Sequence, residues 1–379
     1  MIYLRIIQDI LETSRWALFE DTSRYRRVMQ QLYPDIDTHI KQMQYIEMGG
    51  EGVEVKKMKT LEKIFQEINR RHVRIKKRER KNNNHILYTV LGQLLKIMKS
   101  SDPLFESMKP RLEYLGSYFD GLRVGKPTEY DINVILTIPI DYNKIVLEAQ
   151  KYAYASIKMP KEFRLLSKVP ETAVKGFKKT ESWCDSRYRL SVDSVRSWMQ
   201  GVVDAALNKL PQQGNKRFLK VNNESYEVAF KTSGPANTIT IHIDKDYGID
   251  VDLVPTLQFT RPKIPINTKV DFNKVNITSV NSYFAVPKPN DDDFSWRLAF
   301  PYQERFFTDS KYNLKSTIKL LKLFRDVQGF HKLASYFIKT LFLWEVVENQ
   351  TEGFWINNSL VFLTLYMLGK LRDNLAGGG

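Results

Sequence analysis

The segment Leu115-Gly116-Ser117-Tyr118, followed after a short loop by Glu129-Tyr130-Asp131-Ile132-Asn133-Val134-Ile135-Leu136, decides the fold. Its second part is an acidic strand, in which Glu129 and Asp131 stand two residues apart and therefore point to the same face. A third candidate carboxylate, Asp252, comes much later, in Gly248-Ile249-Asp250-Val251-Asp252-Leu253-Val254-Pro255. A carboxylate from this second strand can close the acidic face into a cage for a divalent metal ion.

Hard oxygen ligands of this kind suit magnesium or manganese. Two such metal ions can stabilise both the attacking and the leaving oxygen of an in-line phosphoryl displacement. The layout therefore favours a template-independent nucleotidyltransferase with a two-metal centre on Glu129, Asp131 and Asp252. Asp250 is a rival to Asp252, because both point the same way. The plainer alternative is an exposed acidic strand beside an unrelated acidic hairpin.

Length and composition are those of a two-lobed enzyme with a sizeable core. The chain has 379 residues, of which 42% are hydrophobic and 27% charged, as is typical of soluble globular proteins. The longest apolar stretch, around Leu360 to Leu368, is too short to span a bilayer, and we expect no signal segment. The one cysteine, Cys184, excludes an internal disulfide framework. We therefore expect a cytoplasmic protein with no membrane partner.

Positive charge is concentrated in one short segment. The net charge is +15, and from Glu54 to Lys81 twelve Lys or Arg stand against four Glu, an excess of eight. Such a block predicts contact with a polyanion. Four of its residues recur at i, i+4, i+7 and i+11, which predicts one face of a continuous helix: Arg70, Arg74, Lys77 and Lys81. The alternatives are a solvated basic helix or a localisation signal. The residues expected to bind nucleic acid are Arg70, Arg71, Arg74, Lys76, Lys77, Arg78, Arg80 and Lys81.

Hydrophobic periodicity predicts an α+β protein with two lobes. We expect a helical N-terminal extension over 1–52, a catalytic lobe with a mixed sheet and the basic helix over 53–295, and a helical C-terminal lobe over 296–379. Asn82-Asn83-Asn84 is expected to interrupt the basic helix, with a further helix over 86–98. A helix is also expected over 191–210, and strands over 217–221, 226–231 and 238–243.

The chain resembles cyclic GMP-AMP synthase in three later blocks, which occur in the same order and with plausible spacing. They are Trp296-Arg297-Leu298-Ala299-Phe300-Pro301-Tyr302-Gln303-Glu304, Ile318-Lys319-Leu320-Leu321-Lys322 and Ala334-Ser335-Tyr336-Phe337-Ile338-Lys339-Thr340. With the glycine-serine turn and the acids, these blocks make the chain similar to the cyclic GMP-AMP synthase-like receptors over roughly Asn82 to Leu375. The resemblance implies a bilobal nucleotidyltransferase fold with a cleft between the lobes.

The same resemblance implies roles for residues of both lobes. It favours Asp252 over Asp250, because the family places its acid after Val251 and before an apolar residue. It implies that Gly116 and Ser117 meet the triphosphate through backbone and hydroxyl groups. The other nucleotide-binding residues that it implies are Arg297 as a reader of the base, Glu304, Lys322, Ser335, and Tyr336 as a stacking platform.

Each of these residues also has a plainer interpretation. Arg297 can pack its stem on Trp296, Glu304 and Lys322 can be exposed helix residues, and Tyr336 can be a core aromatic. Ala299 stands where the synthase has a serine that contacts the nucleotide, so the choice of base stays open.

The resemblance also implies an activating ligand. The DNA-sensing synthase carries a zinc-binding insertion between the blocks that match Glu304 and Lys319, but Arg305 to Ile318 contains no Cys or His here. We therefore expect no zinc, and double-stranded RNA as the ligand, since relatives without the insertion include RNA sensors. The loop between the glycine-serine pair and the acidic strand, with Gly121, Gly125 and Pro127, suits a segment that changes shape when the ligand docks.

The leading hypothesis is an RNA-activated enzyme of innate immunity that joins ATP and GTP into a cyclic dinucleotide. A downstream cyclic-dinucleotide receptor would act on the product, and ligand binding could assemble a dimer. One alternative is a catalytically silent relative that binds nucleic acid or a protein partner. Another is a nucleotidyltransferase with a linear product.

Overall fold

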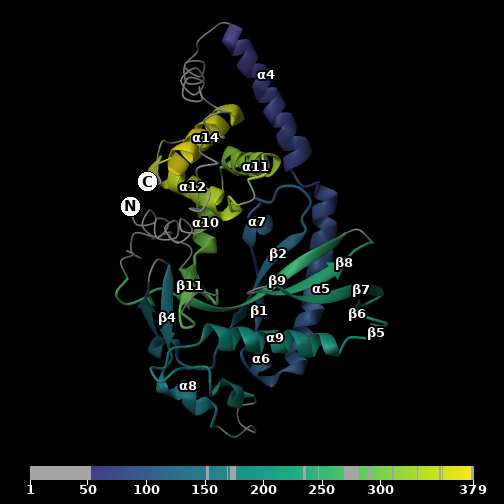
Figure 1. Cartoon of the computed structure of the whole chain (residues 1–379), viewed down its shortest axis with the longest axis vertical. Helices are drawn as coiled ribbons and strands as arrows, with labels where there is room; N and C mark the ends of the chain where they lie inside the picture. The colour runs from purple at the N-terminus through teal and green to yellow at the C-terminus, as the bar shows by residue number, and fades with distance from the viewer. Residues whose placement is uncertain are drawn as a thin grey trace. The chain divides into compact units, whose positions relative to one another are not determined.

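The computed structural model describes residues 53–150, 153–168, 170, 176–233, 236–245, 247–268, 281–288, 292–309, 311–330, 332–349, 351 and 353–376. These residues form two compact units (Figure 1). The sheet unit comprises residues 76–119 and 127–302, and the helical unit comprises residues 53–75, 120–126 and 303–376. The helical extension expected over 1–52 lies outside the described residues.

The sheet unit is built on a mixed sheet of 11 strands. Most of it follows the order β3-β4-β11-β10-β9-β8-β7-β6-β5, while β2 pairs with β1 and β9 off this path. The strands β2 and β9 are parallel, whereas β1–β2, β8–β9 and β10–β9 are antiparallel. The strand bounds are β1 Arg111–Leu115, β2 Glu129–Leu136, β3 Val146–Ala149, β4 Tyr154–Lys158, β5 Gln212–Gln213, β6 Lys216–Val221, β7 Glu224–Ser233, β8 Ala236–His242, β9 Gly248–Thr260, β10 Ser282–Val286 and β11 Trp296–Ala299.

Two long helices, which pack on each other, support this sheet. They are α5, Lys77–Ser101, and α9, Val192–Asn208, whose first turn is capped by the Ser191 hydroxyl accepting from the Ser194 amide. The shorter helical elements are α6 Pro103–Ser107, α7 Gly116–Phe119, η3 Tyr142–Lys144, α8 Lys161–Leu166 and η4 Phe177–Thr180. The helix predicted over 191–210 and the three strands predicted after it are confirmed. The predicted α+β class is confirmed as well.

The predicted continuous basic helix is wrong. A π-helical turn, η2, Asn69–Val73, follows α4, Val53–Ile68, and the backbone is then extended at Arg74 and Lys76 before α5 begins at Lys77. The break falls where the two units meet in sequence: Val73 is fully buried with Leu320 and Leu360 of the helical unit, whereas Lys76 starts the sheet unit. Residues on the two sides of the break therefore pack into different cores, and no single helical face joins Arg70 and Arg74 to Lys77 and Lys81.

The predicted interruption at Asn82-Asn83-Asn84 is also wrong, because α5 runs through all three residues. Asparagine weakens a helix when its side chain competes with the backbone for hydrogen bonds. Asn83 does not compete, since it is buried and its amide donates to the hydroxyls of Tyr130 and Tyr247.

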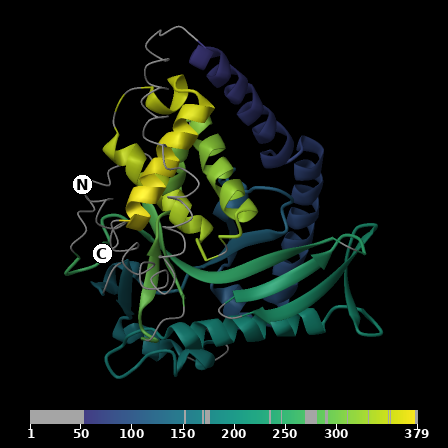
Figure 2. The same cartoon turned by 45° about the horizontal axis from the view of Figure 1, so that its top comes forward.

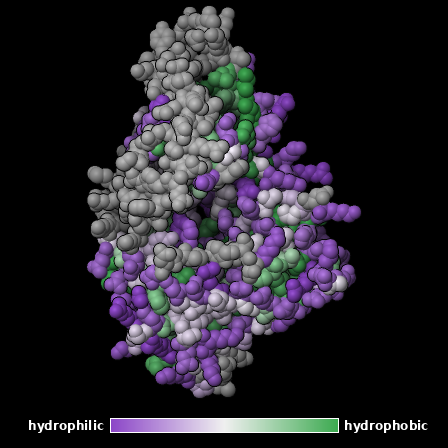
Figure 3. All heavy atoms as spheres, viewed as in Figure 1, coloured by the Kyte–Doolittle hydropathy of each residue, from purple (hydrophilic) through white to green (hydrophobic). Residues whose placement is uncertain are grey.

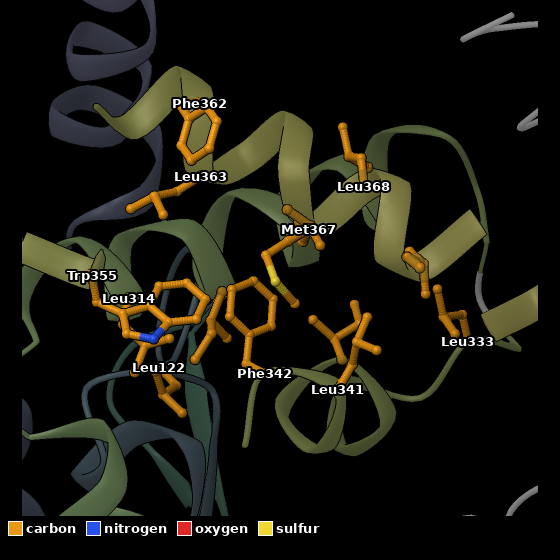
Figure 4. Close-up of a cluster of buried hydrophobic side chains, with 14 of the residues drawn as sticks. Leu122, Leu314, Leu333, Leu341, Phe342, Trp355, Phe362, Leu363, Met367 and Leu368 are labelled. Atoms are coloured by element: carbon orange, nitrogen blue, oxygen red, sulfur yellow. The ribbon is translucent and has the colours of Figure 1, made fainter. Parts of the chain in front are cut away.

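The helical unit surrounds one apolar cluster (Figure 4). Phe342 and Met367 lie near its centre, and Leu122 enters it from the short segment 120–126. Both cartoon views show α11, α12 and α14 side by side (Figures 1 and 2). Besides α4 and η2, the elements are α10 Pro301–Thr308, α11 Tyr312–Val327, α12 Ser335–Glu348, α13 Phe354–Asn357 and α14 Leu360–Ala376.

The segment 53–75 is fastened to this unit by polar contacts as well as by packing. The Glu62 carboxylate accepts hydrogen bonds from the backbone amides of Leu360 and Val361, at the start of α14. A carboxylate at a helix N-terminus accepts hydrogen bonds from amides that have no partner within the helix, and its negative charge interacts favourably with the helix dipole. The structure therefore groups this segment with the C-terminal helices, whereas the sequence places it with the catalytic lobe.

Hydrophilic side chains predominate over the sheet unit on the face that Figure 3 shows. Within the described ranges, none of the helices combines the length and the apolar character that crossing a bilayer requires.

Candidate active site

The acidic residues meet at the parallel pairing of β2 with β9. Asp131 is in register with Asp252, and Glu129 is in register with Asp250. The start of β2 alternates strictly, because Glu129 and Asp131 are exposed while Tyr130 between them is buried. Neighbouring strands lie about 4.8 Å apart, so paired residues on one face are direct neighbours. The sheet thus brings four carboxylates, as two cross-strand pairs, to one face.

The strand β8 provides hydrogen bonds to two of these carboxylates. The Thr238 hydroxyl donates to Asp252 at 2.5 Å, and the Thr240 hydroxyl donates to Asp250 at 2.6 Å. Asp250 also has a cationic neighbour, since the Lys231 ammonium lies 3.9 Å from its carboxylate. The two rival acids are therefore in different electrostatic settings, although they share a face.

The donor set suits a hard divalent cation, since these four groups are carboxylates on adjacent strands. In this conformation, however, no three His, Cys, Asp or Glu side chains of the described ranges are placed so that they could hold a metal ion. The Asp250 and Asp252 carboxylates are instead engaged by the threonines of β8. The residue types fit the metal centre, and their side chains would have to adjust to close around it.

The glycine-serine turn lies directly against Asp131. Gly116 follows β1, whose last residue, Leu115, is in register with Asp131. The φ angle of Gly116 is +81°, and a Cβ at this position would overlap the Asp131 carboxylate. Glycine is required here for both reasons, because other residues are strained at positive φ and would push the acid away. Ser117 is thereby held next to the acidic face.

Arg297 stands on β11 in the sheet unit. Trp296 beside it is fully buried and donates its indole N–H to the Leu190 carbonyl. Successive strand residues point to opposite faces, so the Arg297 and Trp296 side chains leave β11 on different sides. Burial, with a contribution from the charge of Arg297, lowers the pKa of Lys288. The two side chains therefore make a basic spot on this part of the sheet.

The other predicted nucleotide-binding residues come together in the helical unit. Glu304 accepts from the Lys339 ammonium at 2.7 Å, and the Tyr336 hydroxyl lies 3.5 Å from the same carboxylate. Ser335 accepts from the Arg325 guanidinium at 2.6 Å. These contacts join α10 to α12 and α11 to α12 within the helical unit.

Lys322 is not the exposed helix lysine of the plainer interpretation. It is only 6% exposed, and its ammonium donates to the Leu122 carbonyl at 2.9 Å. Burial, with the nearby positive charges of Arg325 and Arg123, lowers the pKa of Lys322 to about 8. Burial thus penalises the charged form of Lys322, and an anion bound beside the ammonium would favour that form.

The sequence did not identify Asp120 as important. This buried carboxylate lies 2.8 Å from the Lys339 ammonium and 3.1 Å from the Arg305 guanidinium. Burial alone would lower the pKa of Lys339, but the Glu304 and Asp120 carboxylates outweigh it and raise that pKa. The signal for Lys339 was present, since it follows Tyr336 by one helical turn. Asp120 stands in a loop that has no hydrophobic periodicity, so the sequence carries no signal for its role.

The basic segment divides between the units. In the helical unit, exposed Arg70 and Arg71 both pair with Glu67. In the sheet unit, the first turns of α5 border a cavity of about 660 Å³ whose lining includes Lys76, Arg78 and Lys81.

Comparisons with known proteins cover both units. The family model of the Mab-21 protein nucleotidyltransferase domain matches residues 118–307, and that of the Mab-21 protein HhH/H2TH-like domain matches residues 313–378. A cyclic GMP-AMP synthase-like receptor of Aethina tumida is 31% identical over 318 residues, which are 83% of this chain and 78% of the relative. The receptor of the same name in Tribolium castaneum is 33% identical over 80% of this chain and 77% of its own length. The receptor of the same name in Trichogramma pretiosum is 31% identical over 82% of this chain and 64% of its own length.

Gly116→Ala should abolish nucleotidyl transfer while leaving the fold intact. The added Cβ would displace the Asp131 carboxylate and strain a residue at positive φ, so we expect a loss of at least roughly 100-fold in turnover and about 1–3 kcal/mol in stability. Turnover and thermal unfolding should be measured together. Gly214→Ala is the control, because Gly214 also has a positive φ but has open space around it. Near-normal turnover of the Gly116 variant would show that the turn does not position the acid.

Lys322→Met should change how stability depends on pH. The unfolded chain keeps the ordinary lysine pKa of 10.5, so the folded state pays a penalty for the charged form that is complete below about pH 8 and fades as the pH rises to 10.5. The variant removes this penalty. Its stability relative to the wild type should therefore fall by roughly 2–3 kcal/mol between pH 7 and 10.5.

Denaturant unfolding across that pH range, without nucleotide, measures the effect. Lys332→Met is the matched control, because Lys332 is exposed. A gap between the Lys322 variant and the wild type that is independent of pH would contradict the lowered pKa.

Proposed function

This chain belongs to the cyclic GMP-AMP synthase-like receptors of the Mab-21 nucleotidyltransferase family, and on that premise we propose that it joins ATP and GTP into a cyclic dinucleotide when double-stranded RNA binds to it. The observation that carries the proposal is the register of β2 with β9, which sets Asp131 beside Asp252 and Glu129 beside Asp250. This arrangement suits phosphoryl chemistry, in which a protein contributes mainly positioning and charge.

The acidic face holds the catalytic metal ions in this proposal. Glu129, Asp131 and Asp252 are the ligands, and Asp250 stays with Thr240 and Lys231. When bound, Mg²⁺ or Mn²⁺ neutralises charge on the triphosphate and activates the attacking ribose hydroxyl. The Gly116 turn brings the backbone and the Ser117 hydroxyl to the triphosphate, because glycine lets the chain approach closely.

The remaining groups bind the nucleotides. Arg297 presents a planar guanidinium fork to one base, and the ring of Tyr336 offers a stacking face to the other. Lys322 and Ser335 contact phosphate, and Glu304 orients the donor through its contacts with Lys339 and Tyr336. Because Ala299 lacks the hydroxyl that the synthase has at this position, base choice is a property to be measured.

The exposed basic residues bind the RNA. A-form duplexes hide their bases in a deep groove, so recognition follows phosphates and shape. Lys76, Lys77, Arg78, Arg80 and Lys81 form one group at the start of α5, and Arg70, Arg71 and Arg74 form another in the helical unit. We place this activity in the cytoplasm, where a downstream receptor would bind the cyclic dinucleotide. We propose a dimer as the RNA-bound form of the protein.

The product assay tests the proposal directly. The protein should convert labelled ATP and GTP, with Mg²⁺ or Mn²⁺, to a cyclic dinucleotide only when duplex RNA is present. Asp131→Asn should reduce this synthesis by at least roughly 1,000-fold, since it removes several kcal/mol of transition-state stabilisation. Its melting temperature and RNA affinity should stay close to those of the wild type, because Asp131 is exposed.

Four outcomes would contradict the proposal. A linear product would place the protein with the oligonucleotide synthetases. An equal yield of cyclic dinucleotide without nucleic acid would show that duplex RNA is not the activating ligand. Stronger activation by duplex DNA of the same length would show the same. A fully active Asp131→Asn would refute the metal site.

A charge reversal tests the RNA surface. Lys77→Glu combined with Lys81→Glu should weaken duplex RNA binding by about 10-fold or more at moderate salt and reduce the slope of log affinity against log salt by about 2. Lys96→Glu combined with Lys99→Glu changes the net charge equally at the other end of α5. If the two double variants bind RNA equally well, the start of α5 is a solvated surface.

A further inference from the structure

Two rows of side chains cross the acidic face of the sheet unit. Each row follows the register of four neighbouring strands, β2, β9, β8 and β7. The first row, which we call the Asp252 row, consists of Asp131, Asp252, Thr238 and Lys231. The second, which we call the Asp250 row, consists of Glu129, Asp250, Thr240 and Ala229. The rows have the same order of groups from β2 to β8, an acid, an aspartate and a threonine, so each can be compared directly with the other.

The two threonines of β8 are equivalent in their surroundings. Thr238 and Thr240 stand two residues apart and therefore point to the same face, where they are 7% and 6% exposed. Each hydroxyl donates to the aspartate beside it in register, from Thr238 to Asp252 at 2.5 Å and from Thr240 to Asp250 at 2.6 Å. Buried hydroxyl groups need such partners in any sheet, so the bonds alone assign no function to either threonine.

A lysine makes the two rows different. Lys231 is in register with Thr238, but its ammonium lies diagonally, 3.9 Å from the carboxylate of Asp250. Carboxylates that stand opposite each other on neighbouring strands repel one another. Lys231 offsets that repulsion at Asp250, whereas between Asp131 and Asp252 a bound divalent cation would offset it. The charge distribution therefore favours the Asp252 row as the place for a metal ion.

The bond from Thr238 engages one defined oxygen of Asp252. The threonine Oγ1 donates to Oδ1, and a carboxylate can accept at both of its oxygens, so Oδ2 can bind a metal ion while this bond is kept. Carboxylates that bind metal ions are themselves held by hydrogen bonds, and the loss of such a partner weakens metal binding by about 10–100-fold. A buried, β-branched donor is stiff, which suits this task.

We propose that Thr238 is a positioning residue of the metal centre, whose hydroxyl holds Oδ1 of Asp252 so that Oδ2 is presented to a divalent cation shared with Asp131. Thr240, by contrast, only satisfies Asp250. The inference rests on the proposed function, which makes Asp252 the metal ligand. It accounts for the different roles of two acids that share one strand, one face and the same kind of hydrogen-bond donor.

Mn²⁺ affinity is the first measurement, because it does not require turnover. Electron paramagnetic resonance measures free Mn²⁺ in samples of the full chain with a non-hydrolysable ATP analogue, and the analogue alone gives the background. Thr238→Val keeps nearly the same shape but removes the hydroxyl, and it should weaken Mn²⁺ binding by about 10-fold. Thr240→Val is the matched control. It makes the same change in the Asp250 row, and its Mn²⁺ affinity should stay within about twofold of that of the wild type, because Asp250 is not a ligand in the proposed function.

A conservative variant and a kinetic measurement separate positioning from a structural role. Thr238→Ser keeps the hydroxyl, so its Mn²⁺ affinity should lie within about threefold of that of the wild type. In the product assay with duplex RNA, Thr238→Val should need about 10-fold more Mn²⁺ for half-maximal rate, and saturating Mn²⁺ should restore most of the rate. Excess metal would not rescue a damaged fold. Thermal unfolding should show similar losses for the two valine variants, since each loses one buried hydrogen bond.

The outcomes separate this inference from the proposed function. If Thr238→Val binds Mn²⁺ as the wild type does, or if both valine variants weaken binding equally, the inference is overturned while the metal centre stands. If only Thr240→Val weakens binding, Asp250 is the ligand, and the assignment of Asp252 is wrong together with the inference. If the wild type neither binds Mn²⁺ above the background nor depends on it for synthesis, the proposed metal centre fails and the inference fails with it. A selective loss in Thr238→Val that serine restores supports the inference.

Discussion

The parallel pairing of β2 with β9 is the constraint on which the rest of the molecule depends. It places Asp131 beside Asp252, although the two residues are far apart in sequence. The strand β2 also pairs with β1, whose last residue, Leu115, is in register with Asp131 and precedes the Gly116 turn. Like charges on neighbouring strands repel one another. The sheet tolerates them because the acids are at least partly exposed, because threonines of β8 donate to two of them, and because Tyr130 is buried beneath the face.

The helical unit contains buried charges that are stabilised by ion pairs. Asp120 and Lys339 are both largely inaccessible to water, and a buried charge left without a partner destabilises a fold strongly. Arg305 and Glu304 complete the set, so that each charge has an opposite neighbour. The segment 120–126 is thereby fixed in the helical unit, while Ser117 before it and Glu129 after it belong to the sheet unit. A loop anchored in this way is suited to connect events in the two units through the chain itself.

The sequence predicted the local features well, because their causes are local. The acidic strand, the strands that follow α9 and the α+β class follow from residue spacing and hydrophobic pattern. The break before Lys77 could not be predicted, since Arg74-Ile75-Lys76 contains no glycine or proline and only the burial of Val73 in another core explains it. The run of asparagines predicts an interruption of the helix. The hydrogen bonds that keep Asn83 within α5 could not be predicted, because its partners, Tyr130 and Tyr247, are distant in sequence. Among the site residues, Gly116 and the acids had a recognisable pattern, whereas Asp120 acquires its role only through tertiary contacts.

The most direct test of the account is to locate the metal. Crystals grown with Mn²⁺ and a non-hydrolysable ATP analogue should be examined by anomalous diffraction at the manganese edge. We predict an anomalous peak for a manganese ion that lies about 2.0–2.3 Å from carboxylate oxygens of both Asp131 and Asp252. Glu129 should lie near this ion, and Asp250 should still accept its hydrogen bond from Thr240. A nucleotide bound without a peak between Asp131 and Asp252, or with the metal on Asp250 instead, would contradict the proposal that the β2–β9 register builds the catalytic centre.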